Sequence, residues 1–162
     1  MLLMKKFLAL LALPAVLSGC AVSSDAAKFA EAPMPAASAD KAVLYVFREY
    51  AEPTAFSADF EIDGRSVTSL AQQGFSWVYL NPGKHRITQK WSFLAAMPTL
   101  NFEREFEANK TYAFEIKGRV TLTGISAGMM HITSSTVVAT VQEELAKRAM
   151  EACCRYVESI KQ

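Results

Sequence analysis

The sequence predicts a mainly β fold, an antiparallel β-sandwich or partly open barrel of about seven or eight strands with one C-terminal amphipathic helix packed on it. Two observations predict the strands: β-branched and aromatic runs recur between residues 41 and 118, and Gly, Pro and Asn residues separate them. A third observation predicts the helix, because apolar residues recur every three or four positions after Thr140. We therefore expect residues 41–162 to form one domain.

The first 19 residues have the three parts of a secretory signal. Two lysines near the start precede an apolar run over residues 7–17, and the small residues Ser18 and Gly19 end the segment. The apolar run is shorter than the roughly 20 residues that a bilayer-spanning helix needs. We expect residues 1–19 to be a signal peptide that is removed.

Cys20 follows directly, in the stretch LSGC, which resembles the lipobox of bacterial lipoproteins. The resemblance implies cleavage between Gly19 and Cys20, with diacylglycerol and a fatty acid such as palmitate on Cys20. It also implies a membrane as partner, through this lipid. Ala21 in place of an aspartate favours the inner leaflet of the outer membrane, facing the periplasm. The alternative is an ordinary signal peptide with a chance cysteine at its end.

Residues 20–40 are dominated by Ala, Ser and Pro, with Phe29 as the one aromatic residue. Such a segment has little to bury, so we expect a lipidated cysteine followed by a flexible tether. At about 3 Å per extended residue, the tether would hold the domain several nanometres from the bilayer. Docking of Phe29 and Met34 on the domain is the less favoured alternative.

The charge of the chain excludes one class of partner. Of the 17 basic residues, 15 lie from Cys20 onward, together with all 16 acidic residues. This near-neutral balance gives no basic surface for nucleic acid, and we expect no nucleic-acid partner.

The strands are expected in the following order. The run AVLYVFRE, residues 42–49, is apolar on both faces and predicts a strand that is covered on both sides. Three hairpins should follow, over residues 56–70, 75–91 and 101–118. Their turns are at Asp63-Gly64, at Pro82-Gly83 and around Asn109.

The C-terminal helix should begin at Thr140, whose spacing from Glu143 is that of a capping box. About five turns are expected, with acid-to-base pairs four residues apart on the exposed face. The apolar stripe that should pack on the sheet consists of Leu145, Ala149, Ala152, Tyr156 and Ile160.

Several of these motifs together resemble a known family. YVFR at residues 45–48, IDG at 62–64, Gly74, NPG at 81–83 and His85 occur in the order found in a bacterial lipoprotein family, domain of unknown function twenty-eight forty-six. The resemblance covers residues 41–141. It implies a small β-sandwich envelope lipoprotein without an assigned activity, and it brings no catalytic residues.

Candidate polar residues do not form a recognisable catalytic site. The two histidines, His85 and His131, have no metal-ligand spacing, and a structural role is favoured for His85. The glycines at 118, 124 and 128 space a loop-like segment without a phosphate-binding signature. We expect no catalytic residue, no metal and no cofactor. Arg48, at the end of an apolar strand, is either an ion-pair partner or a contact for a ligand or another chain.

The segment WSFLAAMPTL, residues 91–100, either covers the core or forms an exposed apolar patch. Core cover is favoured, and Trp91, Phe93 and Met97 are the candidate partner contacts if the patch is exposed. Cys153 and Cys154 are helical neighbours whose side chains diverge, so a bond between them would distort the backbone. Burial of both is one alternative, and an intermolecular or redox disulfide through a more exposed Cys154 is the other.

Three functions remain open. The first, which we favour, is a noncatalytic lipid-anchored envelope protein whose β-domain binds another envelope component. The second is a periplasmic sandwich that binds a small ligand or a peptide in a concave pocket. The third, an enzyme, would need His85 or His131 beside a carboxylate in a cleft.

Overall fold

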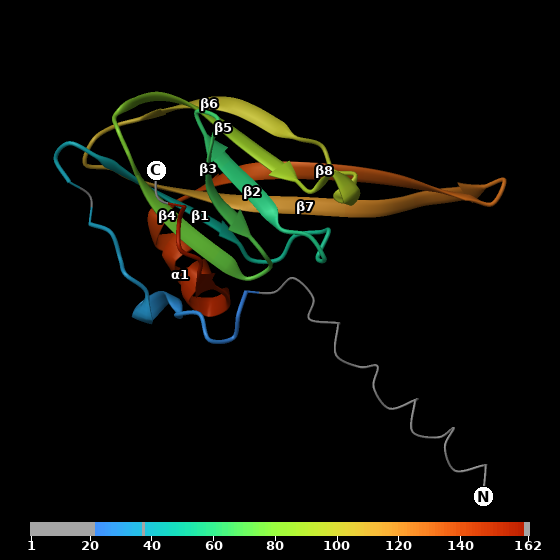
Figure 1. Ribbon diagram of the computed structural model, residues 1–162, viewed down its shortest axis with the longest axis horizontal. Coiled ribbons are helices and arrows are strands. Elements are labelled where there is room, and N and C mark those ends of the chain that lie inside the picture. Colours follow the sequence, from blue (N-terminus) through green and yellow to red (C-terminus); the bar gives the residue numbers. More distant parts are fainter. Residues whose placement is uncertain (1–21, 37, 161–162) are drawn as a thin grey trace, which may run out of the picture.

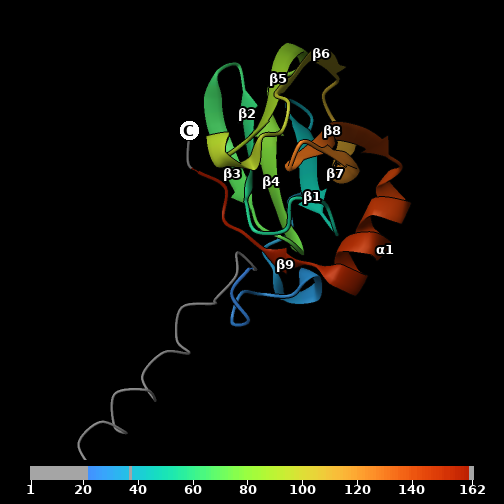
Figure 2. The same ribbon diagram turned by 90° about the vertical axis from the view of Figure 1, so that its right-hand side faces the viewer.

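The computed structural model describes residues 22–36 and 38–160, which form two packed β-sheets and one α-helix (Figure 1). One sheet has the strand order β8-β7-β1-β4-β9 and the other the order β3-β2-β5-β6. Helix α1 covers the outer face of the first sheet, so the layers are helix, sheet and sheet (Figures 1 and 2). The predicted mainly β sandwich with a C-terminal helix is confirmed.

Nine strands occur in the described parts of the chain, against the seven or eight expected. The strands of the first sheet are β1 (Ala42–Arg48), β4 (Gly74–Leu80), β7 (Thr111–Ser126), β8 (Met129–Val141) and β9 (Arg155–Tyr156). Those of the second sheet are β2 (Ala58–Ile62), β3 (Arg65–Leu70), β5 (Gly83–Trp91) and β6 (Leu100–Phe106). The helical elements are η1 (Phe29–Glu31), η2 (Phe93–Ala95) and α1 (Glu143–Cys153).

Strand β1 is buried along its whole length, as predicted from its two apolar faces. Its side chains alternate between two clusters. Leu44 and Val46 join the core between the sheets, whereas Val43 and Tyr45 join the cluster under α1. A strand that is apolar on both faces needs a layer on each side, which explains the three-layer arrangement.

The hairpin of β2 and β3 is the one hairpin prediction that is confirmed. Asp63 and Gly64 both have positive φ, 53° and 78°, which the tight turn requires. Ala58, Phe60 and Ile62 point into the core, while the residues between them are partly exposed.

The other two predicted hairpins are wrong. Strands β4 and β5 belong to different sheets, and so do β6 and β7. Pro82-Gly83 and Asn109 do reverse or redirect the chain, but the chain crosses there from one sheet to the other. Strand β7 instead pairs in parallel with β1, and β6 pairs with β5.

The glycine-spaced segment around residues 118–128 is not a loop. It forms the outer part of a long antiparallel hairpin of β7 and β8, which projects far beyond the rest of the molecule (Figure 1). We call residues 120–134 of this hairpin the arm.

The C-terminal helix is shorter than predicted. Helix α1 has 11 residues, its N-cap is Gln142, and no side chain caps it. Thr140 lies in β8, opposite Phe114, so the capping box is wrong. The buried residues of α1 are Ala146 and Met150, whereas Leu145 of the predicted stripe is 53% exposed. The predicted pair of Glu143 and Lys147 does form, at 2.7 Å.

Candidate functional site

The proposed lipidation site, Cys20, and the cleavage residue Gly19 lie outside the described residues. The first described residue is Val22, which packs closely against Gly74. A Cβ on Gly74 would lie 2.9 Å from a Val22 methyl carbon. Only Ala21 separates Val22 from Cys20.

The segment after Val22 is docked on the domain, which corrects the prediction of a flexible tether. The ring of Phe29 packs on Phe75 with centroids 5.3 Å apart. Trp77 Nε1 donates to the carbonyl of Pro33 at 2.7 Å, and Arg155 donates to that of Ala26 at 2.9 Å.

Composition alone missed this docking because the partners come from elsewhere in the chain. The segment lies beside β9 and α1 (Figure 2), and the amide of Tyr156 donates to the carbonyl of Ala27 at 2.8 Å. Met34, the second residue considered for docking, is 44% exposed.

Arg48 is fully buried, so it does not reach a partner at the surface. Its guanidinium donates to four carbonyl oxygens: those of Ala51 at 2.8 Å, Pro53 at 2.9 Å, Phe56 at 2.6 Å and Leu70 at 2.9 Å. It also stacks over Trp91, 4.6 Å from the ring centroid.

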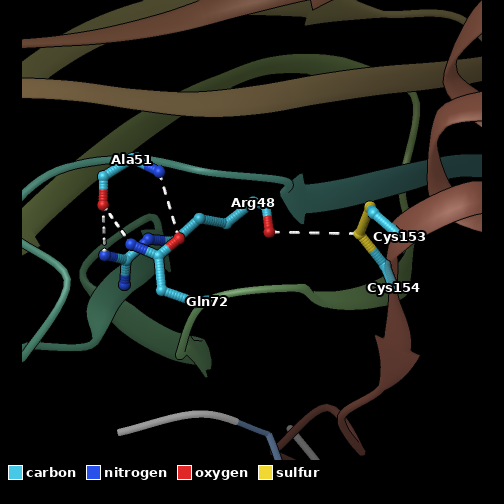
Figure 3. The surroundings of a disulfide bond; sticks show 5 residues. All are labelled: Arg48, Ala51, Gln72, Cys153 and Cys154. Carbon is cyan, nitrogen blue, oxygen red and sulfur yellow. Dashed lines mark hydrogen bonds between the residues drawn. A yellow bond between two sulfur atoms is a disulfide. The ribbon is translucent and has the colours of Figure 1, made fainter. Parts of the chain in front are cut away.

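These contacts give Arg48 a structural role. It ties the loop between β1 and β2 to the end of β3, because a single planar group can satisfy several buried carbonyls. Gln72 completes the arrangement: its side chain accepts from the amide of Ala51 at 3.0 Å and donates to the carbonyl of the same residue (Figure 3).

Cys153 and Cys154 form a disulfide with each other (Figure 3), although at the helical positions predicted for them this bond would distort the backbone. That prediction assumed a continuing helix. Instead α1 ends at Cys153, and Cys154 adopts an extended backbone, which brings the sulfur atoms together. Cys154 is also buried, with its sulfur 3.9 Å from the carbonyl oxygen of Arg48. An intermolecular disulfide through Cys154 would require the bond to Cys153 to open first.

Part of the segment after β5 covers the core and part of it is exposed, so each of the two predicted alternatives holds for some of its residues. Trp91 is buried in the core, and Met97 packs against it, as expected for core cover. Phe93 and Leu94 are 95% and 77% exposed. Of the three candidate partner contacts in this segment, the structure therefore leaves Phe93 fully available.

His85 holds two turns together. Its Nδ1 lies 2.6 Å from a carboxylate oxygen of Asp63, and its Nε2 lies 2.9 Å from the carbonyl oxygen of Asn81. Burial lowers the pKa of His85, but the hydrogen bonds to these two acceptors outweigh it and raise the pKa above its usual value. Burial likewise raises the pKa of Asp63, but hydrogen bonds from the Arg86 amide and His85 lower it overall.

The requirements of a metal centre are not met in the described part of the chain. There, no three His, Cys, Asp or Glu side chains come close enough together to hold an ion. His131 lies in the arm, where it hydrogen-bonds to Ser126, another arm residue. Nor does any helix among residues 22–36 and 38–160 have the length and apolar character needed to cross a membrane.

The arm is the most unusual surface of the described molecule. Its strand register places four apolar side chains on one face: Leu122 opposite Ile132 and Ile125 opposite Met130. A bulge between Leu122 and Gly124 shifts the alternation by one residue, which keeps Ile125 on this face. We call these four residues the apolar face of the arm. Each is between 55% and 71% exposed.

This apolar face continues the core-facing side of the first sheet. Phe114 and Ile116 of β7 point into the core between the sheets, and Gly118, Val120 and Leu122 follow at alternate positions. On β8, Thr136 donates to Gln89 at 2.7 Å and Ser134 donates to the carbonyl of Ala96 at 2.9 Å. Beyond Ser134 the second sheet ends, so the face loses its cover.

Sequence reasoning missed the arm, although one signal was present. Residues 120–141 contain no Asp, Glu, Lys or Arg. A run of 22 uncharged residues with alternating apolar positions is not typical of a solvated loop. The interpretation as a loop came from its glycines, and these lie in the strands and the turn of the hairpin.

A pocket of about 560 Å³ lies at the base of the arm. Its lining includes Glu52, Lys117 and Arg119, so the pocket carries side chains of both signs of charge. Glu52 is already engaged, because its carboxylate accepts a hydrogen bond from the amide of Val120 at 2.6 Å.

Comparison with protein-family models and with curated proteins finds no match to this chain. The family resemblance therefore rests on the motifs at residues 45–85 alone.

Proposed function

We propose that this protein is a noncatalytic, lipid-anchored component of the bacterial envelope that presents its β-domain for binding another envelope component. Cys20 carries the lipid, and the domain faces the periplasm from the inner leaflet of the outer membrane. The observation that carries the binding role is the apolar face of the arm. Exposed, contiguous apolar surface on a soluble domain marks an interaction site more often than it occurs by chance.

The docked N-terminal segment refines how the anchor would act. With Val22 held against Gly74, a lipid on Cys20 would keep the domain directly at the bilayer surface. The motifs shared with the lipoprotein family support the same assignment. A lipoprotein cysteine with several acyl chains binds stably, because each buried methylene contributes about 0.8 kcal/mol.

The positions of the best polar candidates support a noncatalytic role. Arg48 is used to hold four backbone carbonyls, and His85 is used to join two turns. Neither side chain lines the pocket at the base of the arm. His85 lines a second pocket, of about 410 Å³, together with Asp63 and Asn81, to which its two ring nitrogens are already bonded.

The anchor is tested with Cys20→Ala in the full chain. The expected result is loss of labelling by a fatty-acid analogue and release from the membrane fraction. The matched control is the double variant Cys153→Ser and Cys154→Ser, which removes the other two cysteines and should keep both label and membrane attachment. Labelling of the Cys20→Ala protein would refute the anchor.

The second candidate function is binding of a small ligand or a peptide, and the pocket at the base of the arm favours it. In that case Lys117 and Arg119 would hold an anionic group. Chemical-shift mapping with short acidic peptides should then move the signals of both residues. Shifts confined to residues outside this pocket would exclude the candidate.

A further inference from the structure

The outer edge of the arm has the properties of a pairing surface. We propose that strand β8 pairs in antiparallel fashion with β8 of a second copy of this chain, so that two arms lie side by side. This inference rests on the proposed binding role and names its partner. Three features of the structure support it: the composition of the β8 edge, its register, and the apolar side chains beside it.

The edge itself lacks the features that block pairing. Each described sheet has two edge strands, and these are β8, β9, β3 and β6. Strands β9, β3 and β6 carry Arg155, Arg65 and Glu103 respectively. Strand β8 has 13 residues, none of them charged and none proline. Charged side chains, proline and shortness are the usual means by which edge strands avoid each other.

The lack of charge also identifies the partner. An uncharged edge has no complement for a charged strand, and an apolar face is best covered by another apolar face. A second copy of the arm has both an uncharged edge strand and an apolar face, so it meets both requirements of the partner. A two-fold axis perpendicular to the sheet would make the interface isologous, with the same residues contributed by both copies.

A two-fold axis near Thr133 gives a consistent register. Thr133 would then lie opposite Thr133 of the other copy, and Met129 opposite Val137. Met129 and Val137 are 65% and 52% exposed, and both lie on the face opposite the apolar face. The pairing would thus bury an apolar pair on this side at each end of the shared ladder.

The apolar face gains cover in the same arrangement. The segment after Trp91 lies against Ser134, on the apolar side of the hairpin, and it exposes Phe93 and Leu94. In antiparallel arms, the tip of one arm reaches the base of the other. Met130 and Ile132 of one copy would therefore approach Phe93 and Leu94 of its partner. No charged residue lies between residues 91 and 102.

The register is tested by a single cysteine at the two-fold axis. Thr133→Cys in the full chain, in intact cells treated with copper-phenanthroline before fractionation, should give a disulfide-linked dimer on a non-reducing gel. The matched control is Thr121→Cys. Thr121 is the cross-strand neighbour of Thr133 on β7 and is also exposed, but it lies one strand away from the edge. At least tenfold less dimer is expected for it.

A second pair of variants tests the edge without a cysteine. Thr133→Lys places two like charges opposite each other and should abolish crosslinking of the dimer by an amine-reactive crosslinker. Thr121→Lys, which adds the same amine one strand away from the edge, should leave the crosslinking unchanged. Equal crosslinking of both lysine variants would overturn the proposal.

Cysteines at 131, 133 and 135 that all fail to crosslink would also overturn it. If these cysteines were also protected from a membrane-impermeant maleimide, the arm would be covered by the bilayer and not by a second copy. Fractionation of the same samples separates this outcome from failure of the anchor. A dimer found in the soluble fraction would retain the pairing and refute the lipid on Cys20.

Discussion

Residues 113–116 and residues 122–125 belong to the same strand, β7, yet they lie in opposite environments. In the first stretch Phe114 and Ile116 are at most 1% exposed, and in the second Leu122 and Ile125 are 55% and 67% exposed. The side chains are of the same chemical kind and the backbone pairing to β8 is continuous. What differs is the second sheet, which covers one stretch and not the other.

The apolar surface of the molecule thus serves two purposes. In the body, apolar side chains stabilise the fold by leaving water, at about 25 cal/mol per Å². In the arm, equivalent side chains contribute little to the stability of a single chain, so their stabilising contact has to come from another surface.

The body should depend strongly on Arg48. Arg48→Met removes the donors of four carbonyls in the loop and on β3, and each buried carbonyl without a donor costs about 1–3 kcal/mol. We expect the free energy of unfolding in urea to fall by at least about 3 kcal/mol. The control is Arg104→Met on exposed β6, with an expected change below about 0.5 kcal/mol. Similar losses for the two variants would contradict the role given to Arg48.

The same substitution at two sites of β7 compares body and arm directly. Ile116→Ala empties a fully buried position and should cost about 2–5 kcal/mol of unfolding free energy. Ile125→Ala, in the arm, should cost less than about 0.5 kcal/mol in the monomer. Urea denaturation at low protein concentration measures both. An Ile125→Ala loss as large as that of Ile116→Ala would show that the arm is packed and not free.

The N-terminal segment should behave as part of the body. Phe29→Ala removes the ring contact with Phe75 and should lower the stability of the docked segment by about 1–2 kcal/mol. Hydrogen exchange at residues 26–33 should become faster, with the rest of the domain unchanged. Met34→Ala, at a residue that is 44% exposed, is the control. Fast exchange of this segment in the unaltered protein would contradict docking and support a flexible tether.

The smallest effect should come from the His85–Asp63 pair, at the rim of the body. The folded pKa of His85 is raised, so protonated His85 stabilises the fold below its unfolded pKa of about 6.5, and this contribution is lost as the pH rises through the folded value. The folded pKa of Asp63 is lowered, so its contribution is present above its unfolded pKa of about 3.9 and is lost as the pH falls through the folded value.

The pair should therefore contribute most between these limits, around pH 5–6. His85→Gln should lower the free energy of unfolding by about 0.2–1 kcal/mol at pH 5.5, with a smaller loss at pH 8.5. Asp63→Asn should remove most of this pH dependence. A loss of stability for His85→Gln that grows from pH 5.5 to pH 8.5 would have the wrong sign for this pair.

Parts of the fold with a purely local cause were predictable. The strand over residues 42–48 was apparent because both of its faces are apolar, and the β2–β3 turn because Asp63 and Gly64 tolerate positive φ. The end of α1 was not predictable in this way. The apolar spacing continues past Cys153, but the amide of Arg155 donates to Gln73 and that of Val157 to Phe75, and these bonds to the β4 region hold the chain extended.

Among the candidate site residues, the sequence singled out Arg48, Trp91, Phe93 and Met97, but their environments depend on distant segments. Arg48 is surrounded by carbonyls from the loop between β1 and β2 and from the end of β3. Phe93 is exposed whereas Met97 is covered, although they are four residues apart, because only Met97 packs against the core.

The β class of the domain, its near-neutral charge and the uncharged composition of residues 120–141 follow from the sequence alone, since each depends on residue type and local spacing. Only the tertiary structure decided which sheet each strand joins, where α1 ends and which apolar residues stay in water. These depend on partners far apart in the chain, such as β1 with β7 and residues 26–33 with β4 and β9. The arm shows the reason: its strands are set by local pairing, but its exposure is set by where the opposite sheet stops.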